Sequence, residues 1–307
     1  MRVLVTGGGG FVGSHLVERL ESGGYDVAVA RQVDTDLTDM GATARLFDEV
    51  EPELVFHLAA EVGGIGANRA NPGRYWFANL MMGAHVLEQA RIHGTRKLVL
   101  AGTVCAYPKF TPVPFQEEEL WNGYPEETNA PYGVAKKAVL VGAQAYREQY
   151  GLDTIFLLPT NLYGPRDNFD LNTSHVIPAL IRKMIESPEE VVLWGDGTPS
   201  REYLYVDDCV DGFLLAAEQY DGADPVNLGT GVETTIKETV EVVAEAVGFS
   251  GEIRWDPSMP NGQPRRSLDS SKASELFGFS AKVPLREGVA RTVEWYRAAA
   301  LSGASAR

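Results

Sequence analysis

RVLVTGGGGFVG, residues 2–13, is the stretch around which the chain is organised, because an apolar run passes directly into four glycines. Residues 14–24 then carry apolar side chains at helical spacing, with Leu16, Val17 and Leu20 on one face. The pattern therefore predicts a strand, a glycine turn and a helix, which is the context that a dinucleotide fingerprint requires. A flexible linker would neither start inside an apolar strand nor end in an amphipathic helix.

Three of the glycines have distinct expected roles in such a turn. Gly7 permits the tight turn, Gly10 lets the backbone approach a pyrophosphate, and Gly13 lets the helix pack on the strand. Phe11 and Val12 lie in the turn just before the predicted helix, whose N-terminal N–H groups attract anions, and they are expected to contact the cofactor. The sequence therefore predicts a dinucleotide site here.

The end of the second predicted strand, residues 26–30, bears on the choice of dinucleotide. Arg31 follows it, and an arginine suits the 2′-phosphate of NADP, whereas an acid suits the ribose hydroxyls of NAD. We therefore expect NADP, while Asp34 or Asp36 could still reach the ribose of NAD. Asp36 and Leu37 are expected beside the adenine.

Further strands alternate with helices along the first half of the chain. Residues 54–60 and 97–101 are apolar runs, and a long helix is predicted over 73–93 between them. This alternation predicts a doubly wound α/β fold of the Rossmann type with a parallel sheet. Ligands bind beyond the carboxyl ends of such strands, so the small residues that end the first run are expected near the cofactor, namely Leu58, Ala59 and Ala60.

Tyr132 and Lys136 lie four residues apart and would share one face of a helix that ends at about Tyr150, before Gly151. A nearby cation can lower the pKa of a phenol by roughly 1–3 units, which would make Tyr132 a usable acid or base. The pair alone could equally be an interface tyrosine beside a solvated lysine. Thr103, just after a strand end, could supply a second donor to a carbonyl oxygen.

Taken together, these motifs resemble the extended short-chain dehydrogenase/reductase superfamily over nearly the whole chain. Within it the chain resembles the GDP-L-fucose synthase family, the GDP-4-keto-6-deoxy-D-mannose 3,5-epimerase-4-reductases. The segments that carry this resemblance are VGGI (62–65), CAYPK (105–109), PTNLYGP (159–165), DNF (167–169), SHVIPAL (174–180) and the stretch WGDGTPSRE (194–202).

The resemblance implies roles for individual residues. Tyr132 would donate a proton in carbonyl reduction, with Lys136 binding the ribose and tuning Tyr132 and Thr103 assisting at the carbonyl. Cys105 and His175 match the two epimerisation residues; a free thiol titrates near 8.5 and an imidazole near 6.5, so the pair brackets neutral pH. Further cofactor contacts are implied for Pro159, Asn161 and Leu162, and substrate contacts for Asn161, His175, Val176, Leu180, Lys183, Trp194, Arg201 and Arg266.

The sequence departs from the family pattern at several positions. Thr103 stands where the family has serine, and Gly9 replaces a basic residue of the glycine loop. Met259 and Asn261 replace a lysine and an aspartate in a later loop. The chemistry is therefore more firmly predicted than the identity of the sugar.

Composition limits the classes of function. With 307 residues, 44% of them hydrophobic, the chain can bury a substantial core, and its net charge of −15 disfavours nucleic acid and anionic membranes as partners. Cys105 and Cys209 lack metal-ligand spacing, so no metal is expected. With no leader or membrane span recognised, we expect a cytoplasmic protein whose partner is a GDP-sugar.

We expect two structural parts. The dinucleotide-binding domain would comprise residues 1–166 and about 203–231; the substrate-binding lobe would comprise 167–202 and 232–300, and 301–307 would be a frayed tail. A helix is predicted over 175–186, and Asp207 is interpreted as a helix N-cap.

Two other functions remain possible from the sequence. A nucleotide-sugar 4-epimerase or dehydratase with tightly held NAD would keep the fold, and a non-catalytic dinucleotide sensor belongs to another class. The resemblance also implies a homodimer in which the helices at 73–93 and 132–150 pair.

Overall fold

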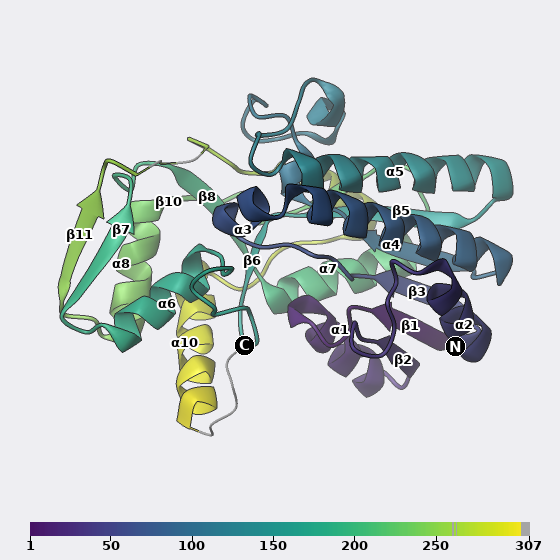
Figure 1. Cartoon of the computed structure of the whole chain (residues 1–307), viewed down its shortest axis with the longest axis horizontal. Coiled ribbons are helices and arrows are strands. Elements are labelled where there is room, and N and C mark those ends of the chain that lie inside the picture. Colours follow the sequence, from purple (N-terminus) through teal and green to yellow (C-terminus); the bar gives the residue numbers. More distant parts are fainter. Residues whose placement is uncertain (260, 262, 302–307) are drawn as a thin grey trace.

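The computed structural model describes residues 1–259, 261 and 263–301 (Figure 1). At its centre is a parallel sheet in the order β2-β1-β3-β4-β5-β9. The strands are β1 (Arg2–Thr6), β2 (Asp26–Ala30), β3 (Leu54–His57), β4 (Lys97–Ala101), β5 (Asp153–Pro159) and β9 (Val226–Leu228). This parallel sheet, with helices on both faces, confirms the predicted doubly wound fold.

The residues of β1 show how the sheet separates two cores. Val3 and Val5 pack on one side against α1 (Phe11–Ser22), α7 (Val206–Gln219) and α9 (Ser271–Phe277). Leu4 points to the other side, as the two-residue period of a strand requires. That side is covered by α2 (Met40–Val50), α4 (Pro72–Ile92) and α5 (Ala130–Tyr150), and α4 runs beside α5 in Figure 1.

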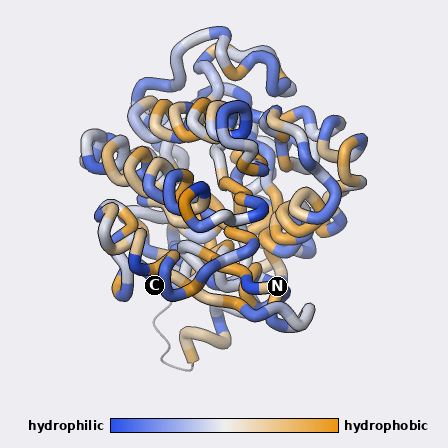
Figure 2. Tube along the Cα trace, turned by 90° about the vertical axis from the view of Figure 1, so that its right-hand side faces the viewer, coloured by the Kyte–Doolittle hydropathy of each residue, from blue (hydrophilic) through white to orange (hydrophobic). Residues whose placement is uncertain are grey.

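A smaller lobe is built on two further sheets and has its own core. One sheet contains β6 (Asn161–Tyr163), β8 (Ser200–Tyr205) and β10 (Glu233–Thr235), and the other pairs β7 (Glu190–Trp194) with β11 (Glu252–Asp256). Its helices are α6 (Val176–Glu186), α8 (Ile236–Val247) and α10 (Leu285–Leu301). Along the helices, hydrophobic residues alternate with hydrophilic ones (Figure 2), as expected for helices with one face on a core.

Three short elements complete the fold. They are α3 (Ile65–Ala70), η1 (Val104–Ala106) and η2 (Glu117–Trp121). Segment 203–206 was assigned from sequence to the first domain, but in the structure its residues fall in two elements, the end of β8 and the start of α7. Its strand β8 belongs to a sheet of the lobe, whereas α7 packs on the main sheet. The division into domains stays a prediction, and residues 302–307 of the expected tail lie outside the described residues.

Several element boundaries differ from expectation. The first helix begins at Phe11 rather than Ser14, so Gly13 lies inside it. His175 is the N-cap of α6 rather than its first residue. The interpretation of Asp207 was wrong, because Tyr205 is the N-cap of α7. Two residues after this N-cap, the Asp207 carboxylate lies 3.2 Å from Nδ1 of His15 on α1.

The described part of the chain contains neither a helix that could span a membrane nor a cluster of side chains that could hold a metal ion. None of its helices has the length and apolarity that crossing a bilayer needs. Nor do residues 1–259, 261 and 263–301 contain a cluster of three or more histidine, cysteine or acidic side chains arranged to hold a metal ion.

Candidate active site

A cavity of about 1170 Å³ lies at the carboxyl ends of the central strands and extends to the lobe. Nearly all the predicted site residues line it. Those on the sheet side are Gly7, Gly10, Phe11, Val12, Gly13, Arg31, Asp36, Leu37, Leu58, Ala59, Ala60, Thr103, Cys105, Tyr132, Lys136, Pro159, Asn161 and Leu162. Those on the lobe side are His175, Val176, Lys183, Trp194, Arg201 and Arg266.

Leu180 is the predicted site residue that the structure does not bring to this cavity. It is 4% exposed and packs in the core of the lobe beside Ile181. On α6, Leu180 lies at the border between the face that Val176 and Lys183 turn to the cavity and the buried face of Ile177 and Met184, and its side chain packs with the buried face. The substrate contact expected for Leu180 is therefore not supported.

The glycine turn is built for close backbone approach. Gly7 has φ +73°, and a Cβ on it would meet the backbone nitrogen of Ala59 at 2.7 Å. A Cβ on Gly13 would collide with the carbonyl oxygen of Gly7. The turn therefore has no room for side chains at these positions, and it leads into the N-terminus of α1, whose first N–H groups have no partners within the helix. These residues fit a dinucleotide pyrophosphate.

The end of β2 supplies a cation to the same part of the cavity. A Cβ on Gly9 would lie 3.2 Å from Cγ of Arg31, so the stem of this exposed arginine runs over the glycine turn. The Asp36 carboxylate accepts hydrogen bonds from the hydroxyl and the N–H of Thr38, and these bonds lower the pKa of Asp36. Asp34 is not among the residues that line the cavity. Arg31 is therefore the cation at this end of the cavity, beside the ionised carboxylate of Asp36.

Tyr132 and Lys136 lie on α5, which begins at Ala130 and ends at Tyr150 as expected, with Gly151 as its left-handed cap. Both side chains are buried, and Nζ of Lys136 donates to the carbonyl oxygen of Ala101 at 2.9 Å. Burial lowers the pKa of Lys136 to about 8.

The pKa of Tyr132 is raised, not lowered as expected from its neighbouring cation. Burial is the largest cause and Cys105 adds to it, while the Thr103 hydroxyl opposes the rise. The expectation failed because burial dominates and Nζ of Lys136 is bonded to the carbonyl oxygen of Ala101, so the phenol keeps its proton at neutral pH.

Cys105 is held beside Tyr132 by the packing of α5 on η1. A Cβ on Gly133 would collide with the carbonyl oxygen of Cys105, so glycine permits this approach. Thr103 is the N-cap of η1, and its hydroxyl accepts a hydrogen bond from the N–H of Cys105 at 3.2 Å. The segment after β4 therefore brings a hydroxyl and a thiol to the buried tyrosine.

Three residues from the lobe side face this group. His175 is exposed at the wall of the cavity, and the protein around its ring, together with the charge of Arg266, lowers its pKa. Nη1 of Arg266 lies 3.8 Å from Sγ of Cys105. The pKa of Arg201 is lowered to about 10 by burial and by Arg266. The thiol and the imidazole therefore share a positively charged wall of the cavity.

Comparison with known proteins agrees with this geometry. Residues 3–229 match the NAD dependent epimerase/dehydratase family, and the match includes the glycine turn and the Tyr132–Lys136 pair. The chain belongs to this family. This membership confirms the predicted resemblance to short-chain dehydrogenases/reductases. The resemblance to GDP-L-fucose synthases is confirmed as well, because several proteins of that name are similar to this chain over nearly its full length.

One relative and two solved structures show the breadth of the family. GDP-L-fucose synthase 1 of Arabidopsis thaliana is 42% identical over 96% of this chain and 93% of its own length. A GDP-L-fucose synthetase from Naegleria fowleri, solved with NADP bound, has a TM-score of 0.91 and 27% identity, covering 99% of this chain and 95% of its own. A UDP-glucose 4-epimerase from Thermotoga maritima, solved with UDP-glucose, has a TM-score of 0.90 and 32% identity, covering 98% and 100%. Backbone similarity alone therefore does not separate reductases from 4-epimerases in this family.

Sequence reasoning missed other polar residues of the cavity wall, among them Asp167, Ser174 and Gln263. Asp167 is 4% exposed, its Oδ2 has no hydrogen-bond partner among the described residues, and burial raises its pKa to about 7. The hydroxyl of Ser174 is also buried without a partner there. Asp167 and Ser174 lie in segments that carry the family resemblance, and Gln263 lies in the loop where the chain departs from the family pattern, which are the signals that could have found them.

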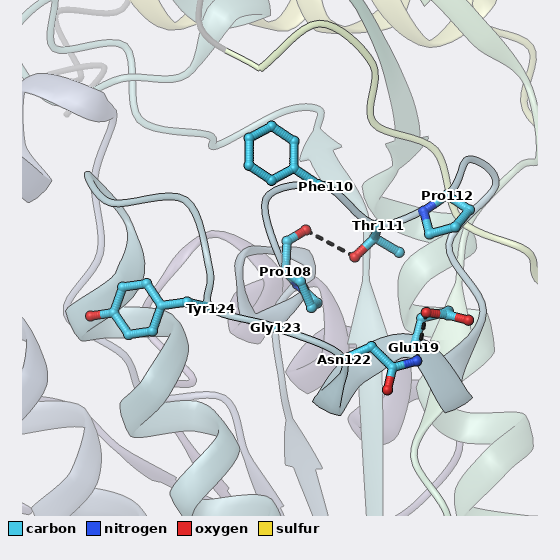
Figure 3. Close-up of a pocket in the computed structure, with 8 residues that line it drawn as sticks. All are labelled: Pro108, Phe110, Thr111, Pro112, Glu119, Asn122, Gly123 and Tyr124. Atoms are coloured by element: carbon cyan, nitrogen blue, oxygen red, sulfur yellow. Dashed lines mark hydrogen bonds between the residues drawn. The ribbon is translucent and has the colours of Figure 1, made fainter.

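A second, small hollow lies apart from this cavity, over the segment 108–124 (Figure 3). Thr111 donates to the carbonyl oxygen of Pro108 and Asn122 donates to Glu119, and Figure 3 draws both bonds. None of the predicted site residues lines this hollow. It is therefore not part of the candidate active site.

Proposed function

We propose that this protein converts GDP-4-keto-6-deoxy-D-mannose into GDP-L-fucose, by epimerisation at C3 and C5 and NADPH-dependent reduction at C4. The observation that carries the proposal is the meeting of two residue pairs in one cavity. Tyr132 and Lys136 suit carbonyl reduction, and Cys105 and His175 suit proton transfer. The name of the Arabidopsis relative, GDP-L-fucose synthase 1, supports the same reaction.

NADP is the cofactor that these residues fit. The glycine turn has room for a pyrophosphate, and Arg31, whose stem crosses that turn, suits a 2′-phosphate. When bound, the reduced nicotinamide would supply hydride to C4. Replacing Arg31→Ala should weaken NADPH binding about tenfold and leave NADH binding unchanged, as measured by fluorescence titration. Equal losses for both nucleotides would show that Arg31 does not recognise the 2′-phosphate.

In the reduction, Tyr132 would give its proton to the C4 oxygen. Its raised pKa keeps the phenol protonated at neutral pH, and Thr103 would donate a second hydrogen bond to the same oxygen. Lys136 would hold the ribose of the cofactor while the carbonyl oxygen of Ala101 fixes its ammonium group. The site is therefore prepared to stabilise negative charge on the substrate oxygen.

In the epimerisation, Cys105 and His175 would exchange protons at C3 and C5. A ketone at C4 acidifies these C–H bonds, because the electron pair left behind is delocalised onto the carbonyl oxygen. The lowered pKa of His175 leaves its imidazole neutral at neutral pH, so it can accept a proton. Tyr132 and Thr103, at the same oxygen, would stabilise the enolate.

The lobe would bind the nucleotide part of the substrate. Lys183 and Arg201 offer cations for the diphosphate, and Trp194, which is exposed at the cavity wall, offers a ring for the guanine. Asn161 and Val176 line the cavity between these groups and the sheet. Calorimetry with GDP and UDP tests this assignment, and equal affinity for the two would contradict it.

The deciding experiment follows nicotinamide absorbance with NADPH and GDP-4-keto-6-deoxymannose and then identifies the product. Stoichiometric NADPH oxidation that yields GDP-L-fucose is the expected result. A 4-epimerase or dehydratase with retained NAD would consume no NADPH, and turnover of NAD-loaded enzyme on ordinary GDP- or UDP-hexoses would replace the proposal. No turnover on any of these would favour the dinucleotide sensor.

We also propose a cytoplasmic homodimer with the two-part organisation set out above. Trp76 and Phe77 on α4 and Val141 on α5 are large hydrophobic side chains exposed on the helices expected to pair. The net charge of −15 argues against nucleic acid and anionic membranes as partners. Light scattering should give twice the chain mass of 33.4 kDa, and a single chain mass would contradict the homodimer.

A further inference from the structure

Arg266 lies at the sulfur of Cys105, although the family resemblance implied a substrate contact for it. Its Nη1 is 3.8 Å from Sγ of Cys105, and its Nε and Nη2 both donate to Oε1 of Gln263, at 3.2 and 2.9 Å. No carboxylate in the described part of the chain forms an ion pair with Arg266. Of the two side chains that the guanidinium contacts, Gln263 and Cys105, only the thiol of Cys105 can become an anion.

Gln263 fixes this arrangement through three contacts. Its side-chain oxygen accepts from Arg266, and its Nε2 donates to the carbonyl oxygen of Lys109 at 3.0 Å. Its backbone oxygen accepts from Nη1 of Arg201 at 2.7 Å. Lys109 lies four residues after Cys105. The amide side chain of Gln263 is therefore bonded both to the guanidinium of Arg266 and to the segment that carries the thiol.

The guanidinium of Arg266 is the charged group in contact with the sulfur of Cys105. Its charge also contributes to the lowered pKa values of Arg201 and His175, so both side chains lie within reach of it. The adjacent Arg265 differs, because it is exposed and pairs with Glu233 at the surface. Arg266 is thus half-buried at the reacting group, whereas Arg265 already has its counter-ion.

We propose that Arg266 is a further catalytic residue, which stabilises the thiolate of Cys105 during proton transfer, and that Gln263 is its positioning residue. The role rests on the proposed function. As a C–H bond next to the ketone breaks, its electron pair enters the enolate and the proton forms an S–H bond at Cys105. When Cys105 donates a proton instead, the S–H bond breaks and the electron pair stays on sulfur. In both directions the anionic sulfur faces the guanidinium.

The test is the rate at which iodoacetamide alkylates Cys105 in the full chain at pH 7, read by mass spectrometry. The thiolate is the reacting form, and the fully buried Cys209 is protected from the reagent. Arg266→Met should slow alkylation about tenfold, since a charge-assisted contact is lost. Gln263→Leu should slow it by a smaller factor, Arg266→Lys should retain most of the rate, and Arg265→Met is the matched control that should leave it unchanged.

Calorimetric titration with GDP separates this role from phosphate binding. The proposal expects the affinity of Arg266→Met for GDP to stay within about twofold of the parent protein. An unchanged alkylation rate in Arg266→Met would overturn the proposal, and a large loss of GDP affinity beside that unchanged rate would make Arg266 a phosphate ligand. Neither measurement needs turnover, so both hold whichever sugar the enzyme reduces.

Discussion

The two ends of the cavity are built in different ways. At the cofactor end, the main-chain turn around Gly7 and Gly13 excludes side chains, and the Lys136 ammonium is fixed by a carbonyl oxygen of β4. At the proton-transfer end, Cys105, His175 and Arg266 come from three separate segments and meet through side-chain contacts. The geometry of the cofactor end is set by the main chain at the ends of the central strands. The geometry of the proton-transfer end depends on how the loops of the lobe pack against the strand ends.

This difference explains why the fold alone leaves the reaction open. The cofactor end requires features that any family member with this sheet can supply, and the chain resembles a UDP-glucose 4-epimerase in backbone as well as a GDP-L-fucose synthetase. The proton-transfer end adds a thiol, an imidazole and a guanidinium that simple reduction does not need. The specific chemistry is therefore encoded in the second end.

The strongest test of the separation removes the proton donor of the reduction. Tyr132→Phe should lower the rate of NADPH oxidation by about 10²–10⁴-fold, because general acid catalysis is lost. Deuterium exchange at C3 and C5, measured by NMR, should fall much less. Tyr146→Phe, on the same helix with its hydroxyl bonded to Glu88, is the control that should change neither rate. Equal losses of exchange and reduction in Tyr132→Phe would show that the two ends do not act separately.

The converse test disables the proton-transfer end. Cys105→Ser and His175→Ala should each lower deuterium incorporation at C3 and C5 by about 10²-fold, the lower limit for general acid–base catalysis. NADPH affinity should be retained, because neither residue belongs to the glycine turn. Unchanged incorporation in both variants would rule out these residues as the bases.

A smaller effect is expected from filling the glycine turn. Gly13→Ala places a methyl group against the carbonyl oxygen of Gly7, and such overpacking costs about 1–3 kcal/mol of the free energy of unfolding. NADPH affinity should fall with it, as read by fluorescence titration and urea unfolding. Gly73→Ala is the matched control, since a Cβ there would meet no atom within 4 Å. Undiminished NADPH binding in Gly13→Ala would show that the turn does not need its close approach.

The smallest effect concerns the loop that leads to His175. The pKa of Asp167 is raised by burial from 3.8 to about 7, so the folded state binds the proton more tightly than the unfolded state. Its contribution to stability is full below pH 3.8 and is lost as the pH rises through about 7. Asp167→Asn should therefore reduce the loss of unfolding free energy between pH 6 and pH 8, by about 1 kcal/mol.

Urea unfolding at the two pH values measures this change. Asp170→Asn, in the same loop, is the control: hydrogen bonds from Asn172 and Thr173 lower the pKa of Asp170, so it is ionised throughout that range. An unchanged pH dependence in Asp167→Asn would mean that the carboxyl group does not titrate in this range.

Features that depend on neighbouring residues were predictable from the amino-acid sequence alone. The apolar run, the glycines and the helical spacing predicted β1, the turn and α1, and the four-residue spacing placed Tyr132 and Lys136 on one face of α5. Nearly all the site residues that the motifs and the family resemblance named line the cavity. Such features are predictable because strand and helix periods and turn geometry act over a few residues.

Contacts between distant segments were decided by the tertiary structure. In the folded chain, Leu180 packs in the core of the lobe and the Asp207 carboxylate lies beside His15. Tyr132 is buried, and this burial raises its pKa. It also set Arg266 against Cys105, which lies 161 residues earlier in the chain. No local pattern specifies these contacts, because they form only when the lobe packs over the ends of the strands and excludes water from the groups between them.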